Sequence, residues 1–68
     1  MFKDNLLFFR KKAGLTQEEL ATKCGIRQQM VFAYEIGTKT PALTVLVSLA
    51  NALGCTVNDL VYDKNIKK

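Results

Sequence analysis

Apolar residues recur along most of the chain at the three- and four-residue spacing of an α-helix. The first apolar stripe follows the positions i, i+4, i+7 and i+11 and comprises Phe2, Leu6, Phe9 and Ala13. Gly14 comes directly after this stripe, where a left-handed glycine commonly ends a helix. We therefore predict a first helix that turns this stripe toward the core and stops in the sequence AGL.

The second helix has a specific start signal. Thr16 and Glu19 have the T-x-x-E spacing of a capping box, in which each side chain binds the backbone of the other. Its inward positions are Leu20, Ala21 and Cys24. Gly25 predicts an end after barely two turns, and Ile26 returns the chain to the core.

A third helix is predicted from about residue 28 to 35, and Gly37 closes it. The sequence TKTPA then indicates a loop, because Pro41 biases the preceding residue away from helical angles. A fourth helix ends before Gly54, and its apolar stripe comprises Leu43, Leu46, Leu49, Ala50 and Leu53.

A short fifth helix begins at a second capping pair, Thr56 with Asp59. Its apolar residues are Val57, Leu60 and Val61. No segment alternates apolar and polar residues over the length of a strand, so the pattern predicts an all-α fold of five short helices. The basic C-terminal residues 63–68 are expected to form a frayed tail.

Length and composition narrow the functional classes. Sixty-eight residues accommodate one compact domain, expected to span residues 1–68, and 49% of them are apolar. The net charge of +4 favours polyanionic partners in general. The longest apolar run near the N-terminus is too short for a signal peptide or a membrane span, so we expect a soluble, cytoplasmic protein without a membrane partner.

The residue types also argue against catalysis. The chain has no histidine, which excludes Ser-His and Cys-His nucleophiles and zinc sites that contain histidine. Cys24 and Cys55 form no CxxC pair and occupy apolar positions, so we interpret them as buried free thiols. We therefore expect no enzyme activity, no cofactor and no bound metal.

Helices two and three have the spacing of a helix-turn-helix, over residues 17–36. Ala21 is small where the two helices cross, and Gly25 allows the positive φ angle of a sharp turn. Ile26, Val31 and Tyr34 are apolar where the third helix faces the core. A small residue, a glycine and several apolar residues at fixed offsets form a far more specific sequence pattern than a single glycine.

From Leu6 to Leu60 the chain resembles the Cro/cI-type helix-turn-helix family, also described as XRE-like or lambda-repressor-like. The matching pieces are GLTQEELA, CGI, YEIG, TKTPAL and LANALGCTVNDL. The resemblance implies a compact five-helix domain that binds DNA as a homodimer on two-fold operators, with the third helix in the major groove. It also implies that Gln17 contacts a phosphate.

Two further sets of residues follow from the resemblance. Arg10 and Glu35 match an ion pair that is often buried in the family; the alternative is that both are solvated charges. Family members commonly pair through the fifth helix and the turn before it. This implies a dimer interface at Val61, Tyr62 and Ile66.

The outward face of the third helix carries the candidate base-reading residues. With Val31 and Tyr34 inward, the opposite side presents Gln28, Gln29, Phe32 and Ala33, with Met30 at its margin. A glutamine amide matches the N6 and N7 atoms of adenine, and apolar groups can contact the thymine methyl. The alternatives are that the glutamines are ordinary solvated helix formers and that the Phe32 ring covers a neighbouring helix.

Departures from the family pattern add other candidates. Arg27 stands where Ser or Thr usually caps the recognition helix, so its guanidinium is expected to reach a phosphate there. Lys39, in the loop after the third helix, is also assigned to the DNA backbone. Leu7 and Phe8 lie off the core stripe; they are either covered by the N-terminal segment or available to a partner chain.

These features predict a sequence-specific DNA-binding transcriptional regulator, acting as a repressor of its own or a neighbouring operon. One alternative is the antitoxin of a toxin–antitoxin pair, which would bind both operator DNA and a toxin, with Leu7 and Phe8 as toxin contacts. Another is a helical interaction module that has lost DNA binding. The positive charge and the outward glutamines argue against that last alternative.

Overall fold

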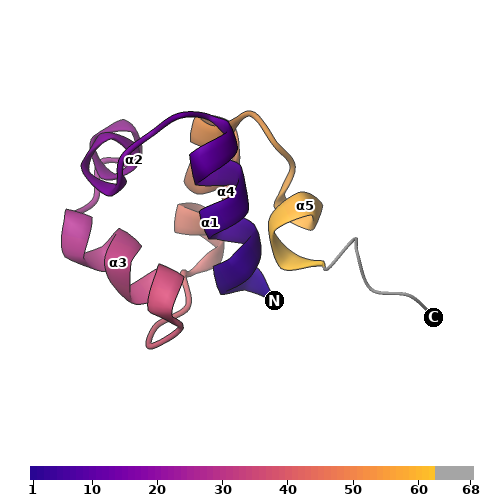
Figure 1. Ribbon diagram of the computed structural model, residues 1–68. Helices are drawn as coiled ribbons and strands as arrows, with labels where there is room; N and C mark the ends of the chain where they lie inside the picture. Colours follow the sequence, from indigo (N-terminus) through magenta and orange to yellow (C-terminus); the bar gives the residue numbers. More distant parts are fainter. Residues whose placement is uncertain (63–68) are drawn as a thin grey trace.

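A computed structural model describes residues 1–62, so the predicted tail and the predicted interface residue Ile66 lie outside the described residues. Five helices follow one another (Figure 1): α1 Phe2–Lys12, α2 Gln17–Cys24, α3 Gln28–Ile36, α4 Leu43–Leu53 and α5 Val57–Val61. No strand occurs in this part of the chain. The predicted all-α, five-helix fold is confirmed.

Both predicted capping boxes are present. At α2 the Thr16 hydroxyl accepts a hydrogen bond from the Glu19 backbone at 3.0 Å, and the Glu19 carboxylate accepts one from the Thr16 backbone at 2.8 Å. Thr56 and Asp59 make the same reciprocal pair at the start of α5. These bonds satisfy backbone N–H groups that a helix end otherwise leaves open, so short local signals fix where α2 and α5 begin.

The core receives one fully buried aliphatic side chain from each helix: Leu6, Leu20, Val31, Leu49 and Leu60. Each such side chain contributes about 1.5–3 kcal/mol when it leaves water, so the five helices depend on one shared centre. None of the helices in residues 1–62 has the length and apolar character needed to cross a membrane.

Two residues of the predicted apolar stripes are not in the core. Ala13 is exposed because it is the C-cap residue of α1, already past the last helical turn. Leu43 is 69% exposed because it is the first residue of α4, where the helix extends beyond the core. The stripe predictions were wrong at these two end positions.

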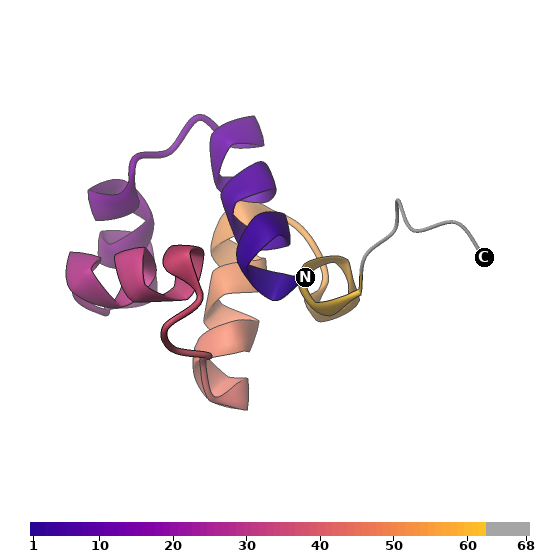
Figure 2. The same cartoon turned by 60° about the horizontal axis from the view of Figure 1, so that its bottom comes forward.

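The α2–α3 turn brings the two helices of the motif close together. Ala21 of α2 is buried, and its carbonyl accepts a 3.0 Å hydrogen bond from the backbone N–H of Ile26 in the turn. Gly25 adopts φ +69°, a left-handed conformation that a side chain would strain. In two views α4 lies between the α2–α3 pair and α5 (Figures 1 and 2).

A polar side chain fastens the last helix to the first. Asn5 Nδ2 donates hydrogen bonds to the carbonyl oxygens of Leu60, at 2.9 Å, and Tyr62, at 3.3 Å. These carbonyls belong to the C-terminal end of α5, whose own helical ladder cannot satisfy them. The sequence pattern gave no signal for this role of Asn5, because a polar residue on α1 is equally compatible with solvent.

Candidate nucleic-acid interface

Helix α3 has one side packed in the core and the opposite side exposed to solvent. Val31 and Tyr34 are buried, whereas Gln28, Gln29 and Phe32 are exposed. Two neighbouring residues are only partly exposed: Ala33, assigned to the outward face, and Met30, which packs against the core. The solvent side of α3 therefore presents two amides and a phenyl ring without any charge.

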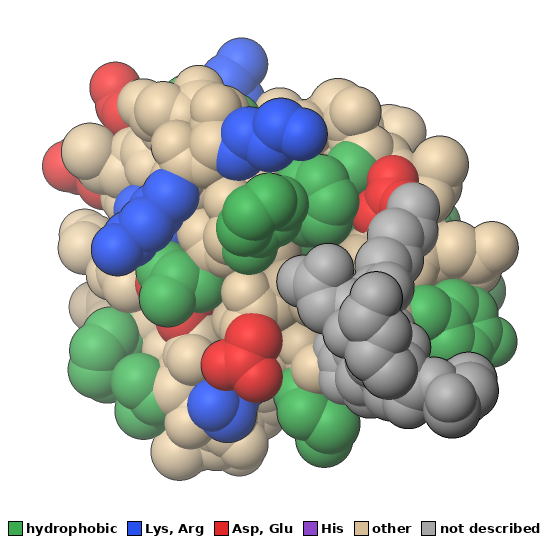
Figure 3. All heavy atoms as spheres, turned by 45° about the vertical axis from the view of Figure 1, so that its right-hand side comes forward, with side chains coloured by type: hydrophobic (Ala, Val, Ile, Leu, Met, Phe, Trp, Pro, Cys, Tyr) green, Lys and Arg blue, Asp and Glu red, His purple; other side chains and the backbone are tan. Residues whose placement is uncertain are grey.

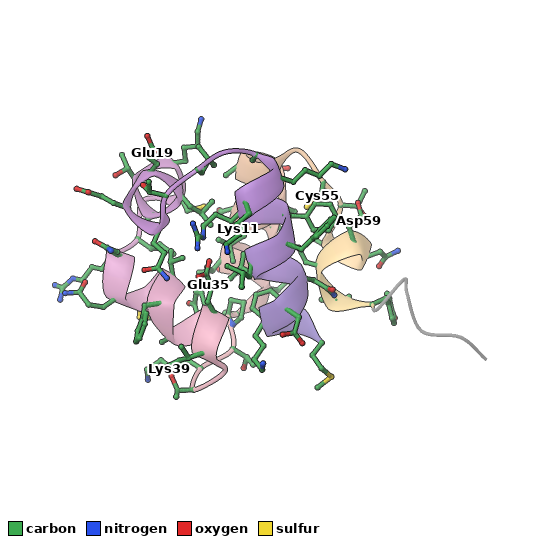
Figure 4. The ribbon with its side chains drawn as sticks, viewed as in Figure 1. Lys11, Glu19, Glu35, Lys39, Cys55 and Asp59 are labelled. Carbon is green, nitrogen blue, oxygen red and sulfur yellow. The ribbon has the colours of Figure 1, made fainter. Side chains whose placement is uncertain are left out.

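Beneath this helix, Glu35 is the centre of a buried polar network. Its carboxylate accepts hydrogen bonds from Arg10 Nε and from Arg10 Nη2, the latter at 3.1 Å. The side chains of Arg10 and Glu35 are only 13% and 6% exposed, so they are a buried ion pair and not two solvated charges. Figure 4 places Glu35 between α3 and α1.

The same network includes the start of α2. Gln17 Nε2 donates a 2.9 Å hydrogen bond to Glu35 Oε1, and Arg10 Nη1 donates one of 2.8 Å to the carbonyl of Leu15. The Glu35 carboxylate of α3 is therefore hydrogen-bonded to side chains of both α1 and α2, and it links the three helices. A glutamine amide has two N–H donors, so Gln17 can keep its bond to Glu35 and still donate outward.

Cationic side chains stand at both ends of α3. Arg27 is the exposed N-cap residue, and its side chain makes no capping bond. Lys39 is exposed in the α3–α4 loop, below the C-terminal end of α3 in Figure 4. The loop is fixed to the helix, since Ala33 O accepts hydrogen bonds from Gly37 N and Thr38 N, both at 3.0 Å. The two charges therefore bracket an uncharged helix face.

The first helix presents a separate exposed group. Phe8 is exposed and meets Phe9 edge-to-face with ring centroids 5.1 Å apart, and Lys12 Nζ lies 5.9 Å from each ring centre. Leu7 is half-buried. On the face shown in Figure 3, apolar side chains reach the surface next to Lys and Arg side chains.

The remaining predicted site residues are less informative. Val61 and Tyr62 are exposed at the end of α5. Cys24 and Cys55 are half-buried, and burial raises the pKa of the Cys24 thiol. Within residues 1–62 no three His, Cys, Asp or Glu side chains gather as metal ligands.

Comparisons with known proteins agree with this arrangement. Residues 7–60 match the model of a helix-turn-helix family. A hypothetical transcription factor from Neisseria, 33% identical, superposes with a TM-score of 0.87 over 93% of this chain and 72% of its own. A chain from a complex of the SinR and SinI proteins has the same fold, with a TM-score of 0.88 at 24% identity, and this chain covers 64% of it.

Curated relatives carry related descriptions. The HTH-type transcriptional regulator YqaE of Bacillus subtilis is 34% identical over the whole chain, which spans 59% of that protein. The transcriptional repressor RstR of the cryptic phage CTXphi, from Vibrio cholerae, is 35% identical over 93% of this chain and 57% of its own length. The chain therefore belongs to the helix-turn-helix family of transcriptional regulators.

Proposed function

We propose that this protein is a cytoplasmic, sequence-specific DNA-binding repressor that inserts α3 into the major groove. The observation that carries the proposal is the division of α3: Val31 and Tyr34 are buried, while Gln28 and Gln29 face solvent between two cationic ends. An α-helix fits the major groove, where each base pair presents a distinct pattern of donors and acceptors.

The chemistry of the outward face suits bases better than phosphates. The amides of Gln28 and Gln29 can each offer a donor and an acceptor to adenine, and they carry no charge that binds every phosphate equally. The exposed ring of Phe32 and the methyl group of Ala33 are suited to the thymine methyl. We therefore expect operators with A·T base pairs at the contacted positions.

A second set of residues is suited to the DNA backbone. Arg27 and Lys39 bring positive charge to the two ends of α3, and Gln17 stands at the first turn of α2. The first-turn N–H groups of a helix attract anions, and a phosphate at the uncapped start of α3 would supply the missing acceptor. These three contacts would orient α3 in the groove without selecting sequence.

The regulatory role and the dimer are inferred from the relatives and the exposed end of α5. RstR is described as a repressor, and YqaE as a transcriptional regulator. We infer a homodimer through Val61, Tyr62 and Ile66, since the first two expose apolar surface. Two-fold symmetry would then pair two α3 helices with two half-sites.

A protein partner is a separate part of the proposal. The solved SinR–SinI complex contains a chain with this fold. The exposed ring of Phe8, with Leu7 beside it, is the surface that we assign to such a partner. The comparisons give no support to the antitoxin alternative.

Selection of bound sites from random duplex DNA, followed by footprinting, tests the proposal. The recovered sites should be two-fold symmetric, with half-site centres about 34 Å apart or a multiple of that distance. Binding should weaken steeply with added salt, because cations released from the phosphates drive association. Failure to enrich any sequence, together with the absence of protection on the gene's own promoter, would contradict the proposal.

A further inference from the structure

A small cleft opens between the start of α1 and the end of α3. It is lined by residues 1–3, by Tyr34 and Ile36 of α3, and by Lys39 of the loop that follows. We call it the α1–α3 cleft. Its volume is about 250 Å³. Pockets for small molecules commonly have about 300–1,000 Å³, so this cleft is suited to a ligand of modest size.

Most of the lining is apolar. Phe2 meets Tyr34 edge-to-face, with ring centroids 6.4 Å apart. Ile36, the last residue of α3, lines the same cleft and is 50% exposed. The Cδ atom of Lys3 lies over Gly37, since a Cβ added there would approach it to 2.9 Å. The rings, the Ile36 side chain and the lysine stem therefore offer apolar surface to a ligand.

One polar atom opens into this lining. The Tyr34 side chain is buried, and its hydroxyl has no hydrogen-bond partner among residues 1–62. Every fully buried side-chain nitrogen or oxygen in that part of the chain has a partner, so the hydroxyl keeps contact with solvent. Because Tyr34 lines the cleft, this contact lies in the cleft. A buried tyrosine hydroxyl usually finds a partner, so this one has a donor to offer to a ligand oxygen.

Both charged side chains of the lining are cations. Lys39 is exposed in the loop below the end of α3 (Figure 4), and Lys3 comes from the first turn of α1. Lys3 Nζ lies 3.2 Å from Asp4 Oδ1, but these side chains are 47% and 64% exposed. An exposed ion pair of this kind is weak, so Lys3 can exchange it for a ligand anion.

We propose that the α1–α3 cleft binds a small carboxylate that carries an aryl or short alkyl group. The apolar group would lie against Phe2 and Ile36. The carboxylate would bind Lys3 and Lys39 and accept a hydrogen bond from the Tyr34 hydroxyl. A bare phosphate or acetate would use the cations but not the apolar lining, and a neutral hydrocarbon would leave both cations unused.

Occupation of the cleft has a consequence for DNA binding. Lys39 is assigned to the DNA backbone, so a carboxylate bound to it would neutralise the cation at the C-terminal end of α3. A bound ligand should therefore lower the affinity for the operator. This regulatory part rests on the proposed function, whereas binding of the carboxylate does not.

Titration of the full chain with phenylacetate, followed by amide chemical shifts in NMR, tests the cleft without DNA. Phenylacetate has a ring and a charge, phenylacetamide has the ring alone, and acetate has the charge alone. At constant ionic strength phenylacetate should bind roughly fivefold or more tightly than either. Its shifts should gather at residues 1–3 and 34–40. Equal affinities for the three compounds, or shifts spread over all the lysines, would overturn the proposal.

Two variants and a matched control place the ligand. Lys3→Gln should weaken binding of phenylacetate but not of phenylacetamide, and Ile36→Gln should weaken binding of both. Lys11→Gln also removes an exposed cation from α1, but this residue does not line the cleft, so the variant should bind like the parent. The three side chains are substantially exposed, so the variants should fold, as circular dichroism would show. Binding like the parent's in both Lys3→Gln and Ile36→Gln would refute the cleft as the site.

Operator binding in the presence of each compound separates this inference from the proposed function. At equal ionic strength, phenylacetate should lower operator affinity at concentrations that saturate the cleft, and acetate should not. Lys3→Gln should need more phenylacetate for the same effect. Shifts at the cleft in a protein that binds no DNA would support the ligand site and contradict the proposed function. Operator binding without shifts at the cleft would contradict the ligand site alone, and a saturated cleft with unchanged operator affinity would contradict the regulatory part.

Discussion

Gln17 and Glu35 are joined by a 2.9 Å hydrogen bond from Gln17 Nε2 to Glu35 Oε1, which ties the first residue of α2 to the last turn of α3. The same carboxylate is neutralised by Arg10 of α1. The helix assigned to the DNA backbone and the helix assigned to the bases therefore share one buried anchor. Their relative position depends on the Glu35 carboxylate, whose side chain is only 6% exposed.

The first prediction concerns this anchor. Glu35→Leu leaves the Arg10 guanidinium buried without its partner and should lower the free energy of unfolding by about 3–5 kcal/mol. Adding Arg10→Met should recover part of the loss, because the double variant contains no unpaired charge. Urea unfolding followed by circular dichroism measures both. Losses that simply add in the double variant would show that the two side chains do not act as a pair.

The second prediction separates base reading from general affinity. Gln28→Ala or Gln29→Ala should cost about 1–3 kcal/mol on the selected operator, and the variant should tolerate base changes that the parent rejects. Both side chains are exposed, so stability should hardly change. A matrix of variants against single-base operator changes measures this. If affinity fell equally for all operator variants and no base change were better tolerated, the two amides would be excluded as base-reading groups. The sequence preference would then have to come from Phe32, Ala33 or the shape of the DNA.

The third prediction concerns the backbone contacts. Lys39→Ala should weaken binding to all sequences about equally and lower the slope of log affinity against log salt by about one charge. Gln17→Ala should also weaken all sequences but leave this slope unchanged, because glutamine is neutral. Titrations at several salt concentrations distinguish the two. A loss confined to particular base pairs in either variant would contradict its assignment to phosphates.

The fourth prediction concerns Asn5, which holds the end of α5. Asn5→Ala removes the donor to the carbonyls of Leu60 and Tyr62 and should cost about 1–3 kcal/mol. Hydrogen exchange should accelerate most in α5, where the lost bonds act. Asn51→Ala, at an exposed position on α4, is the matched control. Equal exchange rates in Asn5→Ala and Asn51→Ala would show that Asn5 does not hold the end of α5.

The fifth prediction concerns the pKa of Cys24, which burial raises. Because the thiolate is the reactive form, Cys24 in a Cys55→Ala background should react more slowly with iodoacetamide when folded than when unfolded in urea. A raised pKa contributes stability below the unfolded value, about 8.5, that is lost as pH rises toward the folded value. Cys24→Ala should therefore lose less stability than the parent above that pH. Equal reaction rates in the two states would refute the prediction.

Local signals in the sequence were sufficient to predict the helices. Thr16 with Glu19 and Thr56 with Asp59 are complete within four residues, and both pairs form in the structure. Periodicity was less reliable at helix ends. Helical spacing predicts that Ala13 and Leu43 face the core, but it cannot show that these helix ends extend beyond the core.

Contacts between distant segments were harder to predict. The resemblance to a family identified Arg10 and Glu35, but the bond from Gln17 to Glu35 joins residues 18 positions apart and has no local signature. Asn5 meets Leu60 across 55 positions for the same reason. Polar side chains of this kind are compatible with solvent in the sequence, and only the packed helices show what they bind.

The division of α3 also has a consequence for evolvability. Val31, Tyr34 and Glu35 connect the helix to the rest of the protein, whereas Gln28, Gln29 and Phe32 have no part in the core. Gln28, Gln29 and Phe32 can therefore change during evolution without loss of the fold, whereas selection for folding constrains Val31, Tyr34 and Glu35. A library randomised at those three positions should yield mostly folded proteins with many different preferred operators. One scaffold of this design could thus supply a genome with a set of regulators that do not interfere with one another.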